Sequence, residues 1–239
     1  MDNVLQTIPL SQLAIAFVPA IFVVALLYRW SLSGGNAIYS LVRMLVQLLL
    51  IGYLLSYIFA TDNQWLVLSV LCVMIGVASW IALRTIKAER RRALYFNTIY
   101  ATVIGGGVTL ILVTQFVLAI DPWYEPSHVI PLAGMVFANA MNCISLAVER
   151  LESEVERGES YLNARNIAFN TAMIPVINSL LAVGLVSLPG MMTGQILSGV
   201  SPLIAVRYQI MVMCMLFGSA GITTALFLVL TKKQYAIKQ

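Results

Sequence analysis

Long apolar stretches constrain this sequence more than any other feature. Runs of about 20 residues with few charges recur along the 239-residue chain, and a helix of that length crosses the hydrocarbon core of a bilayer. We therefore expect the all-α class, a polytopic membrane protein forming a single transmembrane permease domain over residues 1–239. About seven spans are predicted, near 10–28, 37–59, 65–84, 96–120, 129–148, 167–188 and 207–231.

Composition supports the same class. Hydrophobic residues make up 60% of the chain and charged residues only 10%, with a mean hydropathy of +0.91. A soluble domain is nearer a quarter charged. The first residues hold no lysine or arginine, so they lack the basic region of a cleaved signal peptide, and we expect the first apolar segment to belong to the mature protein.

The basic residues predict how the spans are oriented, because short cytoplasmic loops retain lysine and arginine. All fourteen except Arg43 and Arg207 follow the expected first, third, fifth or seventh span. The opposite loops are short and acidic or neutral, as in residues 121–128. We therefore expect the N-terminus outside and the C-terminus in the cytoplasm.

Missing motifs argue against several classes of function. The sequence has no HExxH and no GxxxxGK[ST], and its single histidine is His128. Its three cysteines are scattered, which argues against a disulfide framework and a zinc cluster. The basic residues obey the positive-inside rule, so no nucleic-acid partner is expected. We expect a protein that is no enzyme, binds no ATP through a P-loop of its own, and shows no recognisable metal-ligand set.

Polar residues inside the apolar spans are candidates for a transport path. Arg43 and Gln47 lie one turn apart on the second span, while Asn139 and Asn142 share one face of the fifth span. Such side chains are costly in lipid unless they face other helices. Structural hydrogen bonds between helices and a lining of the path are both open interpretations, and the same choice holds for Asn178 on the sixth span.

Methionine raises a further choice, since thioethers favour soft metals such as Cu(I). Among the 11 methionines, Met211, Met213 and Met215 are two residues apart and do not share one helix face. Methionine is also an ordinary core residue. We favour the core interpretation and leave the metal path open.

The segment over residues 149–166 has a cytoplasmic helix pattern. Apolar residues recur in steps of three and four, with glutamates and arginines on the other faces. It is expected to be an amphipathic loop helix. Two interpretations remain open, an extension of the fifth span or a docking surface for a cytoplasmic partner.

A break in the apolar sequence follows the sixth span. Residues 183–199, VGLVSLPGMMTGQILSG, pass from an apolar run into Pro189-Gly190 and two further glycines. These residues cannot continue a regular lipid-facing helix, so their freed backbone groups must be packed in protein or line a cavity. A tight turn before the last helix and a broken segment at an outer gate are both compatible with the pattern.

Three blocks of sequence carry a family resemblance. They are the second-span pattern that runs from Arg43 to Phe59, the string IPLAGM (130–135) with Asn139-Ala140-Met141, and GLVSLPGMMTG (184–194) with RYQIM (207–211). Together they resemble the FetB/YbbM-like family of ABC-transporter permeases, over residues 36 to 231. That family is associated with iron export in bacteria, and its plant relatives with aluminium tolerance.

The resemblance implies a permease subunit of an ABC transporter, in the plasma (bacterial inner) membrane, that exports iron or contributes to metal homeostasis. A separate cytoplasmic ABC ATPase subunit would bind the ATP, so no cofactor is expected in this chain, and the permease would form a homodimer within membrane lipid. An ATP-independent channel or secondary transporter for a metal or small solute is the alternative, and a membrane scaffold is a third hypothesis.

Two sets of candidate residues follow. We expect the transport path to include Arg43, Gln47, Asn139, Asn142, Asn178, Ser187, Pro189, Gly190, Met191, Met192, Thr193, Gly194 and Gln195. We expect the ATPase contact to include Glu152, Val155, Arg157, Tyr161 and Leu162.

Overall fold

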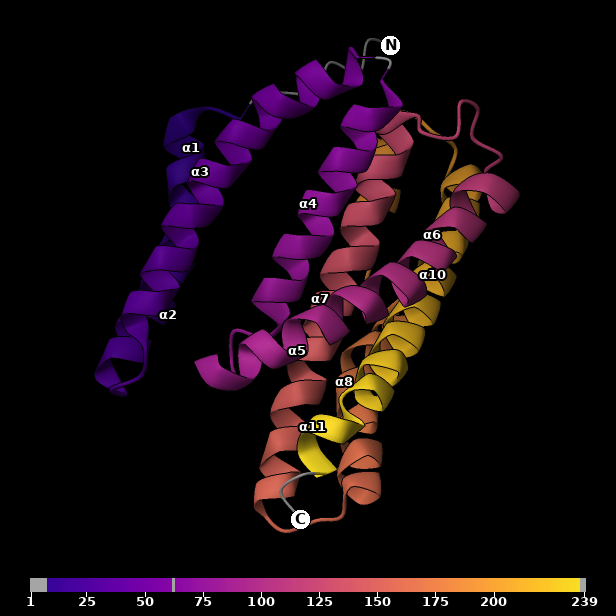
Figure 1. Cartoon of the computed structure of the whole chain (residues 1–239). Coiled ribbons are helices and arrows are strands. Elements are labelled where there is room, and N and C mark those ends of the chain that lie inside the picture. Colours follow the sequence, from indigo (N-terminus) through magenta and orange to yellow (C-terminus); the bar gives the residue numbers. More distant parts are fainter. Residues whose placement is uncertain (1–7, 62, 237–239) are drawn as a thin grey trace. The chain divides into compact units, whose positions relative to one another are not determined.

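The structure, a computed structural model, describes residues 8–61 and 63–236, and most of them lie in helices (Figure 1). Within these ranges the β-structure is limited to an isolated bridge between Val183 and Ser187. The expected all-α class is therefore confirmed. By its internal packing the chain divides into two compact units, residues 1–61 and 62–239. The single permease domain over 1–239 remains a prediction.

The first unit is a helical hairpin. It consists of α1 (Leu10–Ile15), α2 (Val18–Arg29) and α3 (Gly34–Phe59). The turn between α2 and α3 places Ser31 in the left-handed region, with φ of 56°. A Cβ added at Gly34 would lie 2.8 Å from the ring of Tyr28, so a glycine lets the start of α3 approach the end of α2.

The second unit holds the remaining helices. They are α4 (Gln64–Ala82), α5 (Ala88–Ala101), η1 (Thr102–Gly106), α6 (Gly107–Ile111), η2 (Leu112–Val117), α7 (Pro126–Glu156), α8 (Tyr161–Ala182), α9 (Gly190–Leu197), α10 (Pro202–Leu230) and α11 (Lys232–Ala236). Helix α7 is central, since α4, α8 and α10 all pack against it. Its side chains contribute to two buried clusters, one that joins Ile144 with Phe227 of α10 and one that joins Val136 with Met215 of α10.

Local sequence explains where several of these helices begin. The side chain of Asn63 accepts a hydrogen bond from the backbone N–H of Trp65 at the start of α4, over 2.9 Å. Pro126 and Pro202 occupy the first turns of α7 and α10, where the missing N–H of proline costs nothing.

One long helix of the second unit contains two π-helical turns. Elements α5, η1, α6 and η2 join into a helix over Ala88–Val117 that runs obliquely across α7 in Figure 1. At η1, a Cβ added to Gly105 would lie 2.5 Å from Oγ1 and 2.7 Å from the backbone nitrogen of Thr223 on α10. This glycine therefore permits the close packing of η1 against α10.

Six described helices are long and apolar enough to cross a membrane: Ser11–Arg29, Gly34–Phe59, Gln64–Ala82, Ala88–Val117, Pro126–Glu156 and Pro202–Leu230. The expected sixth span, 167–188, is observed as α8, which begins at Tyr161 and ends at Ala182. Polar residues such as Arg165 and Asn170 lower the hydropathy of α8. The count of seven spans remains a prediction.

The segment over 149–166 differs from the single helix that we expected. Helix α7 continues to Glu156, a turn at residues 157–160 follows, and α8 begins at Tyr161. Gly158 in this turn has φ of +90°, a conformation that ends the helix and favours glycine. The segment is therefore the end of one long helix and the start of the next.

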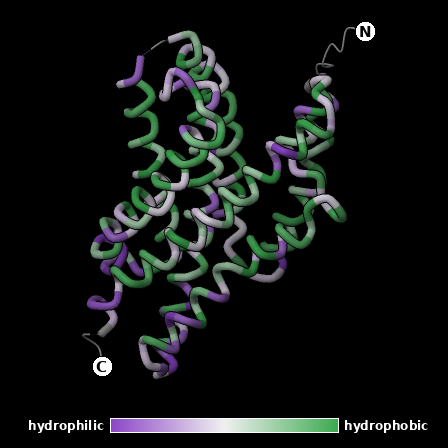
Figure 2. The backbone as a smooth tube through the Cα atoms, turned by 90° about the vertical axis from the view of Figure 1, so that its right-hand side faces the viewer, coloured by the Kyte–Doolittle hydropathy of each residue, from purple (hydrophilic) through white to green (hydrophobic). Residues whose placement is uncertain are grey.

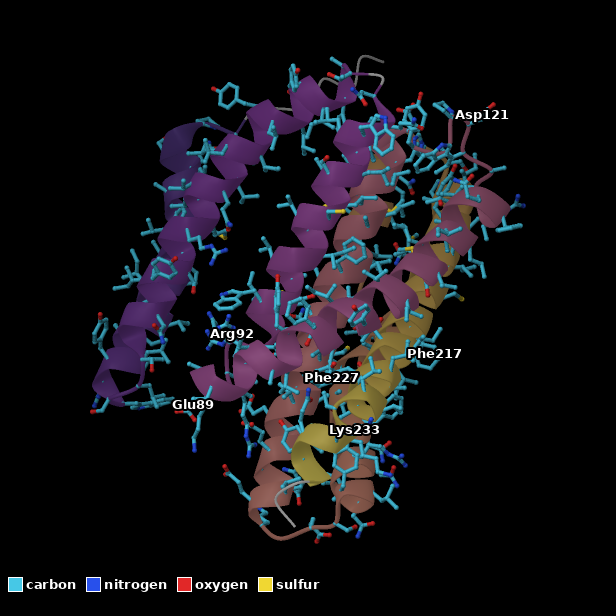
Figure 3. The ribbon with its side chains drawn as sticks, viewed as in Figure 1. Glu89, Arg92, Asp121, Phe217, Phe227 and Lys233 are labelled. Carbon is cyan, nitrogen blue, oxygen red and sulfur yellow. The ribbon has the colours of Figure 1, made fainter. Side chains whose placement is uncertain are left out.

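Polar residues gather toward the helix ends. Figure 2 shows hydrophobic residues along the middle of the long helices and hydrophilic residues nearer their ends. In the second unit, Asp121 lies at one end and Lys233 lies toward the other (Figure 3). Contacts among Arg90, Glu152 and Tyr235 bring the segments after the expected third, fifth and seventh spans together. The side of the membrane that this end faces remains a prediction, and the two terminal segments, 1–7 and 237–239, lie outside the described residues.

Candidate functional site

The candidate site is a cavity of about 430 Å³ in the second unit, at the meeting of α7, α8, α10 and the segment that leads into α9. Its volume is in the range of small-ligand sites. The lining residues are Met135, Asn139, Asn142, Cys143, Leu146, Pro175, Val176, Ser179, Ser187, Pro189, Gly190, Met191, Gln209, Val212, Met213 and Leu216.

Helical spacing explains two walls of this cavity. On α7, Met135, Asn139 and Asn142 are four and three residues apart, which places them on one face. On α10, Gln209 and Met213 follow the same rule. Amphipathic stripes on two neighbouring helices therefore face a common space.

The third wall comes from the break after α8. Gly184 has φ of +82°, and its N–H donates a hydrogen bond to the carbonyl of Ser187 over 3.0 Å. The N–H of Ser187 in turn donates to the carbonyl of Ala182, the last residue of α8. Pro189 is extended and starts α9. The break is thus a tight hydrogen-bonded turn whose residues also line the cavity. Its role as an outer gate remains a prediction.

Pro175 contributes the fourth wall from within α8. A proline in a helix interior has no N–H to donate to the carbonyl four residues earlier, here that of Thr171. The hydroxyl of Ser179 donates to the carbonyl of Pro175 over 2.9 Å, so one backbone acceptor at this point is satisfied locally. The carbonyl of Thr171 therefore lacks the helical N–H donor that residue 175 would otherwise supply.

The polar groups of the cavity are all neutral. The side-chain N–H of Asn139 donates to the carbonyl of Leu216 over 2.9 Å, so this asparagine joins α7 to α10. Gln209 is only 5% exposed, and its Oε1 has no hydrogen-bond partner among the described residues. An unpaired buried oxygen is costly, and it is suited to accept a hydrogen bond or to contact a cation.

Part of the predicted path meets in this cavity. Asn139 and Asn142 line it together with Ser187, Pro189, Gly190 and Met191. Four further residues of the predicted path, Met192, Thr193, Gly194 and Gln195, lie on α9 outside the lining. The hydroxyl of Thr193 donates to the carbonyl of Pro189 over 3.2 Å, which supports the start of α9.

The other predicted path residues lie elsewhere. Asn178 is exposed on α8, and its neighbour Ser179 lines the cavity in its place. Arg43 and Gln47 belong to α3 of the first unit, whereas every lining residue of the cavity belongs to the second. Their role in the path remains a prediction.

Sequence reasoning missed several lining residues, of which Gln209 is the most informative. It lies within RYQIM, and a glutamine inside a long apolar helix was a signal that could have been used. Cys143, Ser179 and Met213 carry no such local signal, because only the tertiary packing brings them to the cavity.

The predicted ATPase contact lies at the other end of α7, in a network of charged residues. Glu152 accepts hydrogen bonds from Arg90, over 3.0 Å, and from the hydroxyl of Tyr235, over 3.3 Å. The guanidinium of Arg90 also lies over the ring of Tyr235, 5.1 Å from its centre. Burial, together with the carboxylate of Glu152, raises the pKa of Tyr235 above its ordinary value.

A second acid in this network is more deeply buried. Glu154 is 5% exposed and forms ion pairs with Arg150, at 2.7 Å, and with Arg157, at 3.1 Å. The charge of this buried carboxylate is therefore compensated by two arginines from the same helix end.

Only part of the predicted ATPase contact is at the surface of the second unit. Leu162 is 55% exposed, and the side chain of Arg157 is 63% exposed. Tyr161 is buried, with its hydroxyl donating to the carbonyl of Leu228, and Val155 packs against the core. Tyr161 therefore fixes the end of α10 in this structure, and Glu152 is engaged by Arg90 and Tyr235.

Known proteins resemble this chain over most of its length. The profile of UPF0014, described as an uncharacterised protein family, matches residues 10–166 and 156–236. A UPF0014 membrane protein of Synechocystis is 34% identical over 218 residues, which cover 84% of this chain and 83% of that protein. No solved structure matches the chain.

Two relatives have names that refer to metals. The probable iron export permease protein FetB of Escherichia coli is 30% identical over 240 residues, covering 94% of this chain and 91% of the relative. Protein ALUMINUM SENSITIVE 3 of Arabidopsis thaliana is 33% identical over 229 residues, covering 88% of this chain and 81% of the relative.

Proposed function

This chain belongs to the UPF0014 family, and from that premise we propose that it is the permease subunit of an ABC transporter that handles metal. It is a multi-pass membrane protein, and we place it in the plasma (bacterial inner) membrane. The relative named as an iron export permease makes iron, moved outward, the first substrate to test.

One observation supports this proposal most strongly. Residues of the GLVSLPGMMTG block line a cavity together with the asparagines of α7 and the buried, unpaired Oε1 of Gln209. A broken segment beside a neutral polar cavity within a helix bundle is an arrangement that transporters use for substrate.

The energy source in this proposal is a separate ATPase subunit. The sequence has no P-loop, so ATP would be bound by the partner. The turn at residues 157–160 and the exposed Leu162 are the surface on which we expect that partner to dock, since they join two long helices at the end rich in basic residues. A permease homodimer with two ATPases is the expected assembly.

Reconstitution tests the proposal. The chain is purified in mild detergent with the nucleotide-binding subunit that accompanies it and is placed in vesicles loaded with Fe²⁺. We expect metal flux that requires ATP and stops when the P-loop lysine of the partner is substituted. Flux that continues without ATP would favour the channel or secondary-transporter alternative, and the absence of any flux with the partner present would favour the scaffold.

A matched pair of variants tests the cavity itself. A Cβ added at Gly190 or at Gly194 meets nothing within 4 Å, so a side chain can start at either position without a clash, but only Gly190 lines the cavity. We expect Gly190→Leu to abolish flux and Gly194→Leu to retain it, with equal membrane insertion. Equal flux in both variants would contradict the assignment of this cavity to the path.

A further inference from the structure

A second, smaller cavity adjoins the first. It has a volume of about 90 Å³, and His128, Tyr208 and Met211 are among its lining residues. Met135 and Met191 line both cavities. These two methionines therefore form the wall between the two spaces.

The small cavity lies toward the end of the second unit marked by Asp121 in Figure 3, because its lining residues Leu118 and His128 flank the loop that contains Asp121. The large cavity continues past Met135 along α7 to Leu146. The two spaces thus follow one another along α7, from its middle toward its N-terminal end.

Methionines of three elements meet along this line. Met135 comes from α7, Met191 from α9, and Met213 of α10 lines the large cavity, while Met211 lines the small one. Met215 is 1% exposed in the core. Residues two apart do not share a helix face, but methionines still line this stretch together because separate helices supply them.

The chemistry of the lining points to a particular kind of ligand. Neither cavity is lined by Asp, Glu, Lys or Arg. The available donors are the thioethers, the thiol of Cys143, amide oxygens that include the unpaired Oε1 of Gln209, and the imidazole of His128. Thioether and thiol donors favour soft metals such as Cu(I). Without a carboxylate to compensate charge, a singly charged ion is held at the lowest desolvation cost.

We propose that the two cavities form one ion path whose constriction is the thioether pair of Met135 and Met191, and that its ligand is a soft, singly charged metal cation of the class of Cu(I) and Ag(I). As a path, the inference rests on the proposed transport function, whereas the binding site can be tested without transport. Gln209 supplies an oxygen ligand on the large-cavity side, and Met211 with His128 supplies the next donors beyond the constriction.

Silver binding tests this site directly. Silver nitrate is titrated calorimetrically into the full chain in detergent, in chloride-free buffer and without a histidine tag. The exposed thiols of Cys72 and Cys214 would bind silver themselves, so both are replaced by serine in every protein compared. We expect saturable binding that Met135→Leu and Met191→Leu each weaken by about tenfold or more, and that the double variant removes.

Two controls separate loss of the site from loss of structure. Met215→Leu changes a buried methionine that lines neither cavity, and Met44→Leu changes an exposed one on α3. Leucine and methionine have similar volumes, so all four variants should keep the folded state in size-exclusion chromatography. Silver affinity should be unchanged in both controls.

Three results would overturn the inference: no saturable silver binding, an equal loss in Met215→Leu, or binding that depends on Cys143 and not on Met135 or Met191. Flux of Fe²⁺ in the same preparation distinguishes this failure from that of the proposed function. ATP-driven flux of Fe²⁺ without silver binding would contradict the thioether site and would still support the permease. Methionine-dependent silver binding in a protein that shows ATP-driven flux of neither Fe²⁺ nor Ag⁺ would support the site and contradict the permease.

Discussion

The two ends of α7 handle polar groups in opposite ways. Toward Glu156, the half-buried Glu152 and the buried Glu154 have arginine partners at 2.7 to 3.1 Å. Toward Met135, the helix borders a cavity that no charged side chain lines. The Oε1 of Gln209 is buried there without a hydrogen-bond partner among the described residues. Removing one partner of a buried ion pair leaves a costly unpaired charge, so such pairs belong to the folded structure. A buried polar atom without a partner can instead bind a ligand. The difference separates structural from functional polar groups, the first on α7 itself and the second on α10 where it packs against α7.

The largest expected effect lies at the paired end. Glu154→Gln removes the charge that two arginines share, and we expect the free energy of unfolding to fall by about 2 kcal/mol. The loss is smaller than for a fully buried pair because Arg157 is 63% exposed and can be solvated. Thermal unfolding in detergent measures it, with the exposed Glu156→Gln as the control. Equal midpoints for the two variants would show that the pairing contributes nothing.

The matching substitution at the cavity end, Gln209→Leu, should lower metal flux without lowering the stability of the fold. Gln209→Leu removes an oxygen that has no partner, so we expect the unfolding midpoint to stay level or to rise. Metal flux should fall by about tenfold, which corresponds to about 1.4 kcal/mol. Flux and unfolding are measured on the same preparation. If Gln209→Leu lowered the unfolding midpoint, Gln209 would be a structural residue like Glu154. The contrast between the two ends of α7 would then fail.

The smallest expected effect concerns the pH dependence of the paired end. Tyr235 has a raised pKa, so the folded state holds its proton more tightly than the unfolded state. This contribution to stability is complete below the unfolded pKa of about 10 and is lost as the pH rises through the higher folded pKa. Tyr235→Phe also removes the hydrogen bond to Glu152, at a cost of about 1 kcal/mol near pH 8. The stability difference between wild type and variant should shrink above pH 10, and a constant gap in unfolding scans would contradict this origin.

Much of the architecture was accessible from the sequence because apolar length and charge are local properties. The helical class and the helices around 64–82 and 202–230 follow from them directly. The extension of α7 to Glu156 was less accessible, since its amphipathic repeat is equally compatible with a separate surface helix. The turn at Gly158 decides that question.

The cavity was predictable only where polar residues interrupt apolar ones. Asn139, Asn142 and the Pro189-Gly190 break stand out in that way, and all of them line it. Met135, Cys143 and Met213 are ordinary in composition for a membrane helix, and their place at the cavity depends on how α7, α9 and α10 pack. Tyr161 shows the converse, because a tyrosine at a helix start next to charged residues suggests a surface contact and is in fact buried under the end of α10.

The π-turns at Thr102–Gly106 and Leu112–Val117 also bear on how this helix can change length during evolution. A π-turn is an α-helix with one residue inserted, so losing one residue there returns the turn to α-geometry and leaves both flanks in register. The same deletion in a regular stretch, such as the middle of α10, would rotate everything beyond it by about 100° and carry its inner face into the lipid. The two turns are therefore places where a descendant of this chain could be one residue shorter and keep the same packing.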